Sequence, residues 1–349
     1  MTFERVRSIV VINNSISAEL VRQDLLARGR RLDQTALILL RDVREPWMDE
    51  CAIVLRYPGR PSQSLIGQLR FMRFYRAAAR LLRRLQCDAS VRDIYLVNND
   101  NLVTSHLLSW AETDGAAIVT VAAEGLMNYQ EIGLANRASW RWWTKPIVAR
   151  ALGFRYRQPR GHLSGAFEPR VDRVVSFSAE GLKAPPKKVV VRKFGERSPL
   201  RESDPSVALV VLTGLNQWMD EARFVPFAHA FVDWVKGAGF RKILVKKHPR
   251  VSAGLMEELL ADHEEVGRDR AAEDMAADLE AGTIVGACCT ALVTLKLVRP
   301  DLKCIDFGSD YYIEHAYRGD DSIKTLLLAA GVSLVQMPVD TPIENRSNA

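Results

Sequence analysis

The fold class follows from one run near the start of the chain, Ser8-Ile9-Val10-Val11-Ile12-Asn13-Asn14-Ser15. Its four consecutive apolar residues indicate a buried strand, and the polar residues after them indicate a turn. Residues 16–27 then carry apolar side chains at helical spacing and end close to Gly29. A strand, a turn and a helix in this order predict an α/β domain with a parallel sheet.

The same alternation continues along the chain and restarts once. Strands are expected at residues 35–40, 51–55, 93–97, 117–121, 171–178, 207–212, 243–245, 283–285 and 303–307, and helices at 63–85, 102–112, 223–236, 253–263 and 323–330. A polar, proline-bearing stretch precedes the restart at residue 207. For 349 residues we therefore predict two domains, 1–182 and 206–349, joined by a linker over 183–205.

Composition indicates a globular protein with an uneven charge distribution. Hydrophobic residues make up 48% of the chain and charged residues 26%. The first 200 residues carry 32 Lys and Arg against 19 Asp and Glu, whereas the remainder carries 16 against 23. The two halves therefore differ electrostatically, and we expect them to do different work.

Cysteine usage and hydropathy bear on the location of the protein. Its five cysteines show neither a disulfide framework nor a metal-ligand spacing, which favours a reducing cytoplasm. The first apolar run is too short for a signal peptide, and no run reaches the length of about 18 apolar residues that crosses a bilayer. We expect a cytoplasmic protein whose contact with the inner membrane, where it occurs, is peripheral.

A cationic cluster follows one predicted strand of the second domain. The strand at residues 243–245 runs directly into Lys246-Lys247-His248-Pro249-Arg250. Ligands of open α/β sheets bind outside the carboxyl ends of the strands, so cationic side chains at this position suit a phosphate-bearing ligand. The alternative is a basic turn on a solvated surface.

Two further strand ends carry candidate site residues. Glu124 follows the strand at residues 117–121, and Gly125 permits a tight turn beside a ligand. The alternative for Glu124 is a helix N-cap or a surface ion pair. After the strand at 283–285, small residues and the hydroxyl of Thr290 open a helix, an arrangement that holds phosphate on backbone N–H groups.

Two basic segments of the first domain suit an anionic surface. Arg73, Arg76, Arg80 and Arg84 share one face of the helix expected at 63–85, which is either an ordinary solvated face or a surface for anionic acceptors or lipid headgroups. The segment from Trp140 to Tyr156 mixes tryptophans with basic residues. It either lies at a membrane interface or packs on the first domain.

The motifs in combination resemble one family. Glu124-Gly125 with Asn128-Tyr129, then His248-Pro249, then Cys289-Thr290 resemble, in order and spacing, the acidic-acidic-Gly, His-Pro and Ser-Ser/Thr motifs of bacterial sialyltransferases. The likeness is to the polysialyltransferase and lipooligosaccharide sialyltransferase group. This chain departs from the pattern twice, because Ala123 stands at the first acidic position and Cys289 at the first serine.

The resemblance implies a GT-B glycosyltransferase, with two Rossmann-like domains facing across a cleft. It implies inverting transfer of sialic acid, or a related acidic sugar, from its CMP conjugate to a glycan acceptor during synthesis of bacterial surface polysaccharide. Glu124 would be the general base, and His248 would stabilise or protonate the departing phosphate. Lys247, Pro249, Cys289 and Thr290 would contribute to binding of the donor, with Thr290 and the helix start behind it completing the phosphate cradle. Glu273 would bind ribose hydroxyls.

Other classes of function have less support in the sequence. The chain contains no Asp-x-Asp sequence, no Walker loop and no Gly-x-Gly-x-x-Gly motif, so we expect no metal and no other cofactor besides the donor. Its basic residues are scattered without a nucleic-acid-binding module. Two alternatives stay open: a GT-B transferase that uses CMP-Kdo or a UDP-sugar, and a non-catalytic GT-B-like scaffold that binds anionic polysaccharide.

Overall fold

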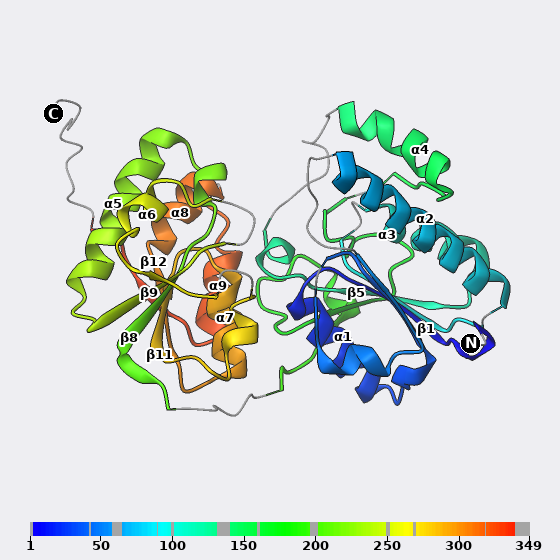
Figure 1. Cartoon of the computed structure of the whole chain (residues 1–349), viewed down its shortest axis with the longest axis horizontal. Helices are drawn as coiled ribbons and strands as arrows, with labels where there is room; N and C mark the ends of the chain where they lie inside the picture. The colour runs from blue at the N-terminus through cyan, green and yellow to red at the C-terminus, as the bar shows by residue number, and fades with distance from the viewer. Residues whose placement is uncertain are drawn as a thin grey trace. The chain divides into compact units, whose positions relative to one another are not determined.

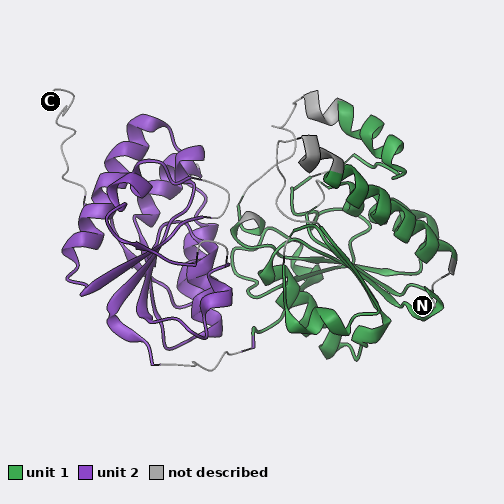
Figure 2. Cartoon of the chain, in the orientation of Figure 1, with its two compact units in different colours: residues 1–194 green, residues 195–349 purple. Residues whose placement is uncertain are grey.

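A computed structural model describes residues 3–41, 43–57, 65–88, 90–98, 101–130, 140–158, 161–195, 202–248, 252–267, 270–317 and 319–338. The chain forms two compact units, which Figure 2 shows in different colours. Unit 1 comprises residues 1–194 and unit 2 comprises residues 195–349. Each unit has a parallel sheet of its own.

Unit 1 is built on a seven-stranded sheet. Its strands are β1 (Ser8–Ile12), β2 (Thr35–Leu39), β3 (Ile53–Arg56), β4 (Asp93–Leu96), β5 (Ile118–Ala122), β6 (Arg173–Ser176) and β7 (Val189–Val191). They lie in the order β3-β2-β1-β4-β5-β6-β7, and all the recorded pairings are parallel. The direction of winding reverses between β1 and β4, which is the strand order of a Rossmann fold.

Helices cover both faces of the unit 1 sheet. They are α1 (Ser15–Ala27), α2 (Leu65–Asp88), α3 (Leu102–Asp114) and α4 (Trp140–Leu152). One hydrophobic cluster joins Ile9 and Val11 of β1 to α2, α3 and α4, and a second joins Val10 and Ile12 to α1. Alternate residues of β1 thus face opposite layers, and Figure 1 shows α2, α3 and α4 on one side of the sheet and α1 on the other.

Unit 2 repeats this strand order with six strands. They are β8 (Asp204–Val211), β9 (Lys242–Lys246), β10 (Glu264–Glu265), β11 (Ala281–Gly286), β12 (Lys303–Phe307) and β13 (Ser333–Val335), in the order β10-β9-β8-β11-β12-β13. The helices are α5 (Glu221–Gly237), α6 (Leu255–Leu259), α7 (Thr290–Val298), α8 (Ser309–Ala316) and α9 (Ser322–Ala329). Here the winding reverses between β8 and β11.

The structure corrects the predicted linker. Residues 189–191 form β7, which pairs with β6 through Val174 and Val189, so this part of the stretch 183–205 belongs to the first sheet. Three consecutive valines favour such a strand, although the prolines just before them suggested a linker. At the other end of the stretch, β8 begins at Asp204 rather than at residue 207.

Other differences concern short or unforeseen elements. The helix expected at 253–263 covers only Leu255–Leu259, and the strands β10 and β13 and the helix α8 were not predicted. The basic aromatic segment beginning at Trp140 forms α4, whose Ala149 and Leu152 pack into the core of unit 1. None of the helices within the described ranges is long and apolar enough to cross a membrane.

Candidate active site

The reversal point of the unit 1 sheet gathers polar side chains from three strands. Asn13 follows β1, Asn98 lies two residues beyond β4, and Glu124 lies two residues beyond β5. Since β1, β4 and β5 are neighbours in the sheet, their carboxyl ends lie together. Ligands of open α/β sheets bind at such a reversal point.

Glu124 is held at this point by side-chain amides. Its side chain is half-buried, and Nδ2 of Asn13 donates a hydrogen bond to Oε1 of Glu124. Nδ2 of Asn98 donates to Oε2 at 2.8 Å. A carboxylate offers about four acceptor sites, and the two amides occupy one on each oxygen. The carboxylate is therefore oriented by two strands other than its own.

The backbone of Glu124 is fixed as well. Nδ2 of Asn14 donates to the Glu124 carbonyl oxygen at 2.7 Å, while Oδ1 of Asn14 caps helix α1 by accepting from the Ser17 N–H at 2.8 Å. On the other side, the Glu124 N–H donates to Oδ1 of the buried Asn128 at 2.8 Å. Asn14 thus ties the start of α1 to the loop that carries the carboxylate.

The backbone conformation of residue 125 explains why a glycine follows Glu124. Its φ of 129° and ψ of −150° lie in a region that is essentially accessible to glycine alone. This conformation leads into the short 3-10 helix Leu126–Asn128, whose last residue bonds to Glu124. The next residue, Tyr129, is buried and hydrogen-bonds through its hydroxyl to Ser176 at 2.7 Å. Gly125, Asn128 and Tyr129 therefore each have a structural role in holding the loop that carries Glu124.

Arg41 is a cation close to this site. It follows β2, the strand beside β1, and burial lowers the pKa of its guanidinium while the negative charge of Glu124 opposes that shift. Arg41 therefore belongs to the electrostatic environment of the carboxylate.

Ala123 is the residue directly before Glu124. It is fully buried, and its N–H donates to the Val175 carbonyl oxygen of β6 at 2.9 Å, so it continues the ladder of β5. Glu124 is the acid that this chain presents at the strand end, and the amides of Asn13 and Asn98 surround it.

In unit 2, the cationic cluster begins at Lys246, the last residue of β9, and continues beyond the strand. Lys246 is buried, and its Nζ donates to the Lys247 carbonyl oxygen at 3.0 Å. Lys247 forms an ion pair with Glu265 at 3.2 Å, and the side chain of His248 is exposed. Pro249 and Arg250 lie outside the described residues.

The turn from β11 into α7 has an unusual backbone. Cys288 has a φ of 49°, which is a left-handed conformation that side chains other than glycine seldom adopt. Its N–H donates to Oδ1 of the buried Asp306 at 3.0 Å, and Oδ2 of Asp306 accepts from the Tyr312 hydroxyl at 2.8 Å. Asp306 thereby holds the turn that leads to Cys289 and Thr290.

Cys289 is the N-cap of α7 but makes no side-chain capping bond, and Thr290 is the first helical residue. Burial raises the pKa of the Cys289 thiol to about 12, so this thiol stays neutral near pH 7. Among the described residues, no three His, Cys, Asp or Glu side chains gather as a metal site. In general, the backbone N–H groups in the first turn of a helix have no partner within that helix and can bind an anion.

Glu273 lies beside the same helix. Its Oε1 accepts a hydrogen bond from the Thr294 hydroxyl at 2.6 Å, one helical turn after Thr290. Its charge also contributes to the raised pKa of Cys289, although burial is the main cause. The structure thus brings Glu273 and the Cys289-Thr290 motif together, although about 15 residues separate them in sequence.

The structure adds residues that the sequence interpretation did not select, namely Asn13, Asn14, Asn98, Arg41 and Asp306. Four of these five come from the segments directly after β1, β2 and β4. A search for polar residues just beyond each predicted strand would have found those four. Asp306 lies within β12, between the apolar residues Ile305 and Phe307. A carboxylate between two buried apolar residues was the sequence feature that could have identified it.

Comparisons with known proteins give a fold and no family. No protein-family model and no curated protein matches the chain. Among solved structures, an α/β-galactoside α-2,3-sialyltransferase from Photobacterium phosphoreum superposes with a TM-score of 0.50 at 10% identity, over 94% of this chain and 98% of that chain. MurG from Acinetobacter baumannii gives a TM-score of 0.40 at 11% identity, over 95% and 86% of the two chains.

A UDP-GlcNAc 2-epimerase from Neisseria meningitidis gives a TM-score of 0.47 at 10% identity, over 95% of this chain and 88% of that chain. At these identities the likeness concerns the fold alone. The likeness to the α-2,3-sialyltransferase, together with the two Rossmann-type strand orders, identifies a two-domain GT-B fold.

Proposed function

We propose that this protein is an inverting glycosyltransferase that moves sialic acid, or a related acidic sugar, from its CMP conjugate to a hydroxyl of a glycan acceptor. The observation that carries this proposal is the Glu124 carboxylate, held by Asn13 and Asn98 at the reversal point of the unit 1 sheet. An oriented carboxylate at a ligand-binding edge is the group that deprotonation of a sugar hydroxyl requires.

In the proposed reaction, the acceptor oxygen forms a bond to the anomeric carbon of the donor sugar. The bond from that carbon to the CMP phosphate oxygen breaks, and its electron pair leaves with the phosphate. Glu124 accepts the hydroxyl proton as the new bond forms. The amides of Asn13 and Asn98 keep the carboxylate in one orientation, which favours proton transfer by positioning.

Unit 2 supplies the groups proposed for the leaving phosphate. His248 and Lys247 lie beyond β9, and N–H groups of the first turn of α7 lie beyond β11. Partial positive charge at a helix N-terminus, together with a lysine and an imidazole, stabilises the charge that CMP gains as it departs. Glu273, adjacent to α7, is the proposed partner of the ribose hydroxyls.

A donor assay tests this proposal. The purified protein is incubated separately with CMP-Neu5Ac, CMP-Kdo and UDP-sugars in the presence of glycan acceptors, and release of CMP or UDP is measured together with the glycosylated product. We expect product from CMP-Neu5Ac. Product from CMP-Kdo or a UDP-sugar alone would move the donor assignment to that sugar, and no turnover with any donor would favour the non-catalytic scaffold.

Two additions to the assay test the roles of individual groups. Chelation with EDTA should leave the rate within about twofold, because the proposed phosphate site consists of protein groups. His248→Ala should lower turnover by roughly a hundredfold, because a group that stabilises the transition state is lost. Full activity of a folded His248→Ala protein would remove His248 from the mechanism.

A further inference from the structure

Helices α2 and α4 of unit 1 present a row of arginines to solvent. Five arginines line a groove of about 520 Å³ between these helices, together with Ala151, Leu152 and Gly153. They are Arg73, Arg76, Arg80 and Arg83 of α2 and Arg150 of α4. We call this set the α2–α4 arginine face, and all five side chains are exposed.

The membership of this face differs from the sequence expectation at one position. Arg84 was expected beside Arg73, Arg76 and Arg80, but its guanidinium lies over the ring of Phe3, with 5.7 Å to the ring centroid. Arg83 lines the groove instead. Its Nη2 lies 3.2 Å from the position that a Cβ would occupy at Gly153.

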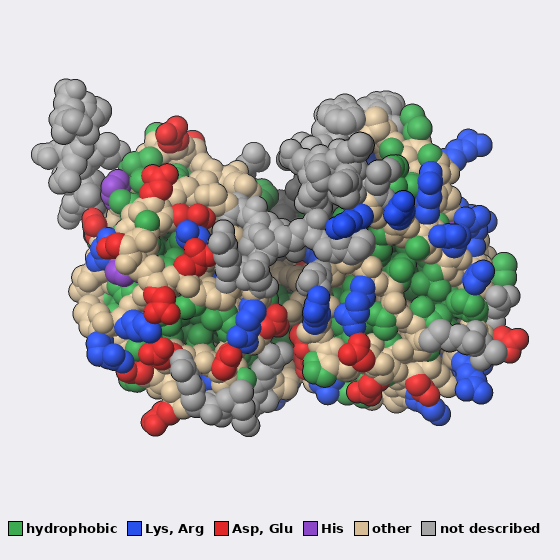
Figure 3. All heavy atoms as spheres, viewed as in Figure 1, with side chains coloured by type: hydrophobic (Ala, Val, Ile, Leu, Met, Phe, Trp, Pro, Cys, Tyr) green, Lys and Arg blue, Asp and Glu red, His purple; other side chains and the backbone are tan. Residues whose placement is uncertain are grey.

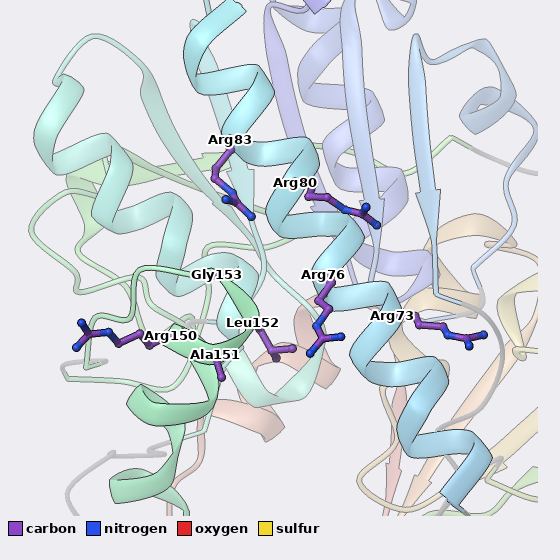
Figure 4. A pocket seen from close by; sticks show the side chains of 8 residues that line it. All are labelled: Arg73, Arg76, Arg80, Arg83, Arg150, Ala151, Leu152 and Gly153. Carbon is purple, nitrogen blue, oxygen red and sulfur yellow. The ribbon is translucent and has the colours of Figure 1, made fainter.

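The guanidinium groups spread out rather than converge. Figure 4 shows Arg76 and Arg83 pointing into the space beside the end of α4, Arg73 and Arg80 extending from the other flank of α2, and Arg150 extending away from α2. A small anion is bound by donors that converge on it. A spread of charges along two helices suits an extended negative surface instead.

These charges have no acidic partners within the described part of the chain. No ion pair joins any of the five arginines to an Asp or Glu there. Nε of Arg83 donates a hydrogen bond to the Ala79 carbonyl oxygen at 3.4 Å. Figure 3 shows Lys and Arg side chains gathered over α2 and α4, with hydrophobic side chains between them. Among the described residues, no carboxylate forms an ion pair with this face.

Large apolar side chains are exposed on the same two helices. Ile147 of α4 is 71% exposed and Val148 is 44% exposed, while Phe71 and Met72 of α2 are each 37% exposed. Ile147 and Arg150 are three residues apart, so they share one side of α4. The opposite sides of both helices are buried, with Phe74 and Ala78 of α2 and Ala149 of α4 in the core. Packing of these buried sides into the core therefore holds the exposed arginines and aliphatic side chains in place on unit 1.

We propose that the α2–α4 arginine face docks on a membrane that contains anionic phospholipids. Arginines attract lipid phosphates, and the side chains of Ile147 and Val148 enter the boundary between headgroups and acyl chains. An anionic glycan in solution would use the arginines but would leave two exposed aliphatic side chains of α4 without a role. This proposal concerns a surface apart from Glu124 and does not depend on the proposed transfer reaction.

Vesicle co-sedimentation of the full chain tests the proposal. We compare vesicles of phosphatidylcholine with vesicles that contain phosphatidylglycerol as well. The parent protein should bind only the anionic vesicles, and Arg73→Gln, Arg76→Gln, Arg80→Gln and Arg83→Gln in one protein should lower the partition coefficient at least about tenfold. Circular dichroism and thermal unfolding verify that each variant is folded.

A matched variant distinguishes an effect of the α2–α4 arginine face from an effect of the protein's net charge. Arg5, Arg92, Lys187 and Lys193 are exposed basic residues of unit 1 elsewhere in the chain, and their joint replacement by Gln removes the same charge. This control should bind anionic vesicles within about threefold of the parent at physiological salt, where charges are screened beyond about 8 Å. Equal losses in the two quadruple variants would overturn the proposal, as would failure of the parent protein to bind anionic vesicles.

The aliphatic side chains distinguish a membrane from a soluble polyanion. Ile147→Gln with Val148→Gln should weaken vesicle binding by roughly threefold or more, because apolar area is no longer buried. Binding of dextran sulfate, a soluble polyanion, should be unchanged in this variant. The four arginines could instead prove necessary for binding dextran sulfate but not for binding vesicles. In that case the face is a site for soluble polyanions, and the membrane assignment is wrong.

Discussion

Glu124 is the residue on which the proposed chemistry most depends. Because Asn13 and Asn98 donate to its two oxygens, Gln at this position retains size but places an NH₂ group against an amide donor. Glu124→Gln also cannot accept the acceptor's proton. We therefore expect transfer to fall by roughly two to four orders of magnitude, measured as product formed from CMP-Neu5Ac at saturating acceptor.

CMP binding is the control for this variant. Glu124 belongs to unit 1 and the proposed nucleotide site to unit 2, so Glu124→Gln should bind CMP within about threefold of the parent in calorimetry. Loss of thermal stability and of CMP affinity together with the rate would mark Glu124 as a structural residue. A folded variant with the parent's rate would end its assignment as the base.

Asp306 gives unit 2 a pH-dependent stability. Burial raises the pKa of its carboxyl group from 3.8 to about 7, against the opposing hydrogen bonds from the Tyr312 hydroxyl and the Cys288 N–H. Between about pH 4 and pH 7 the folded chain retains a proton that the unfolded chain has lost. This contribution to the free energy of unfolding is therefore complete below pH 4, declines as the pH rises, and is lost above pH 7.

Asp306→Asn isolates this effect. Asparagine retains an oxygen that accepts from the Cys288 N–H but does not titrate, so it removes the dependence on pH. We expect the parent to lose, relative to the variant, on the order of 3 kcal/mol of unfolding free energy between pH 4 and pH 8. Urea unfolding of both proteins at several pH values measures this difference. A difference that stays constant with pH would show that Asp306 is ionised throughout.

At the scale of elements, the loop between β5 and the 3-10 helix Leu126–Asn128 depends on Gly125. Its backbone conformation costs a residue with a Cβ on the order of 1–3 kcal/mol. Gly125→Ala should therefore lower thermal stability and shift Glu124 away from the Asn98 amide, so transfer should fall by roughly tenfold or more. Differential scanning calorimetry and the donor assay measure these two effects.

Gly237 provides a matched control for that substitution. It lies at the end of α5, its φ is not positive, and nothing lies within 4 Å of the position that a Cβ would occupy. Gly237→Ala should be neutral or slightly stabilising, because it restricts the unfolded chain. If both substitutions have the same small effect, the conformation of Gly125 does not position Glu124.

The spacing of apolar residues in the sequence predicted strands and helices well in both units, wherever an apolar strand was followed by a helix. Residues 8–12 and 303–307 form strands as expected, because most of their residues are apolar and buried: residues 9–12 in the first, and Cys304, Ile305 and Phe307 in the second. Helix α8 was not predicted because its eight residues include charged and polar side chains that obscure the apolar spacing of Tyr312 and Ile313. Three-residue β13 is held by pairing with β12, which a local pattern cannot show.

The candidate site was predictable only in part for a related reason. Glu124 stood out as an acid followed by glycine at a strand end. The contribution of Asn98 depends on β4 lying between β1 and β5, and this neighbour relation is a property of the sheet rather than of any local sequence. The hydrogen bond between Asn13 and Glu124 likewise joins residues 111 positions apart.

At the scale of the whole molecule, the two units differ in charge, and the proposed function gives them different tasks. The first 200 residues carry the excess of positive charge, and the α2–α4 arginine face lies among them. The remainder carries an excess of negative charge, so the proposed binding of an anionic nucleotide sugar there requires a local group of cations. Lys247, His248 and the first turn of α7 form the proposed local group.

Unit 2 should fold and bind CMP without unit 1. Residues 195–349 contain a complete six-stranded sheet with helices of its own, so a protein of these residues alone should fold. Since the proposed phosphate and ribose contacts come from unit 2, the fragment should bind CMP within about threefold of the full chain in calorimetry. It should not form the glycosylated product, because it lacks Glu124. If the folded fragment fails to bind CMP while the full chain binds it, unit 1 contributes to the nucleotide site, and the division of tasks between the two units is wrong.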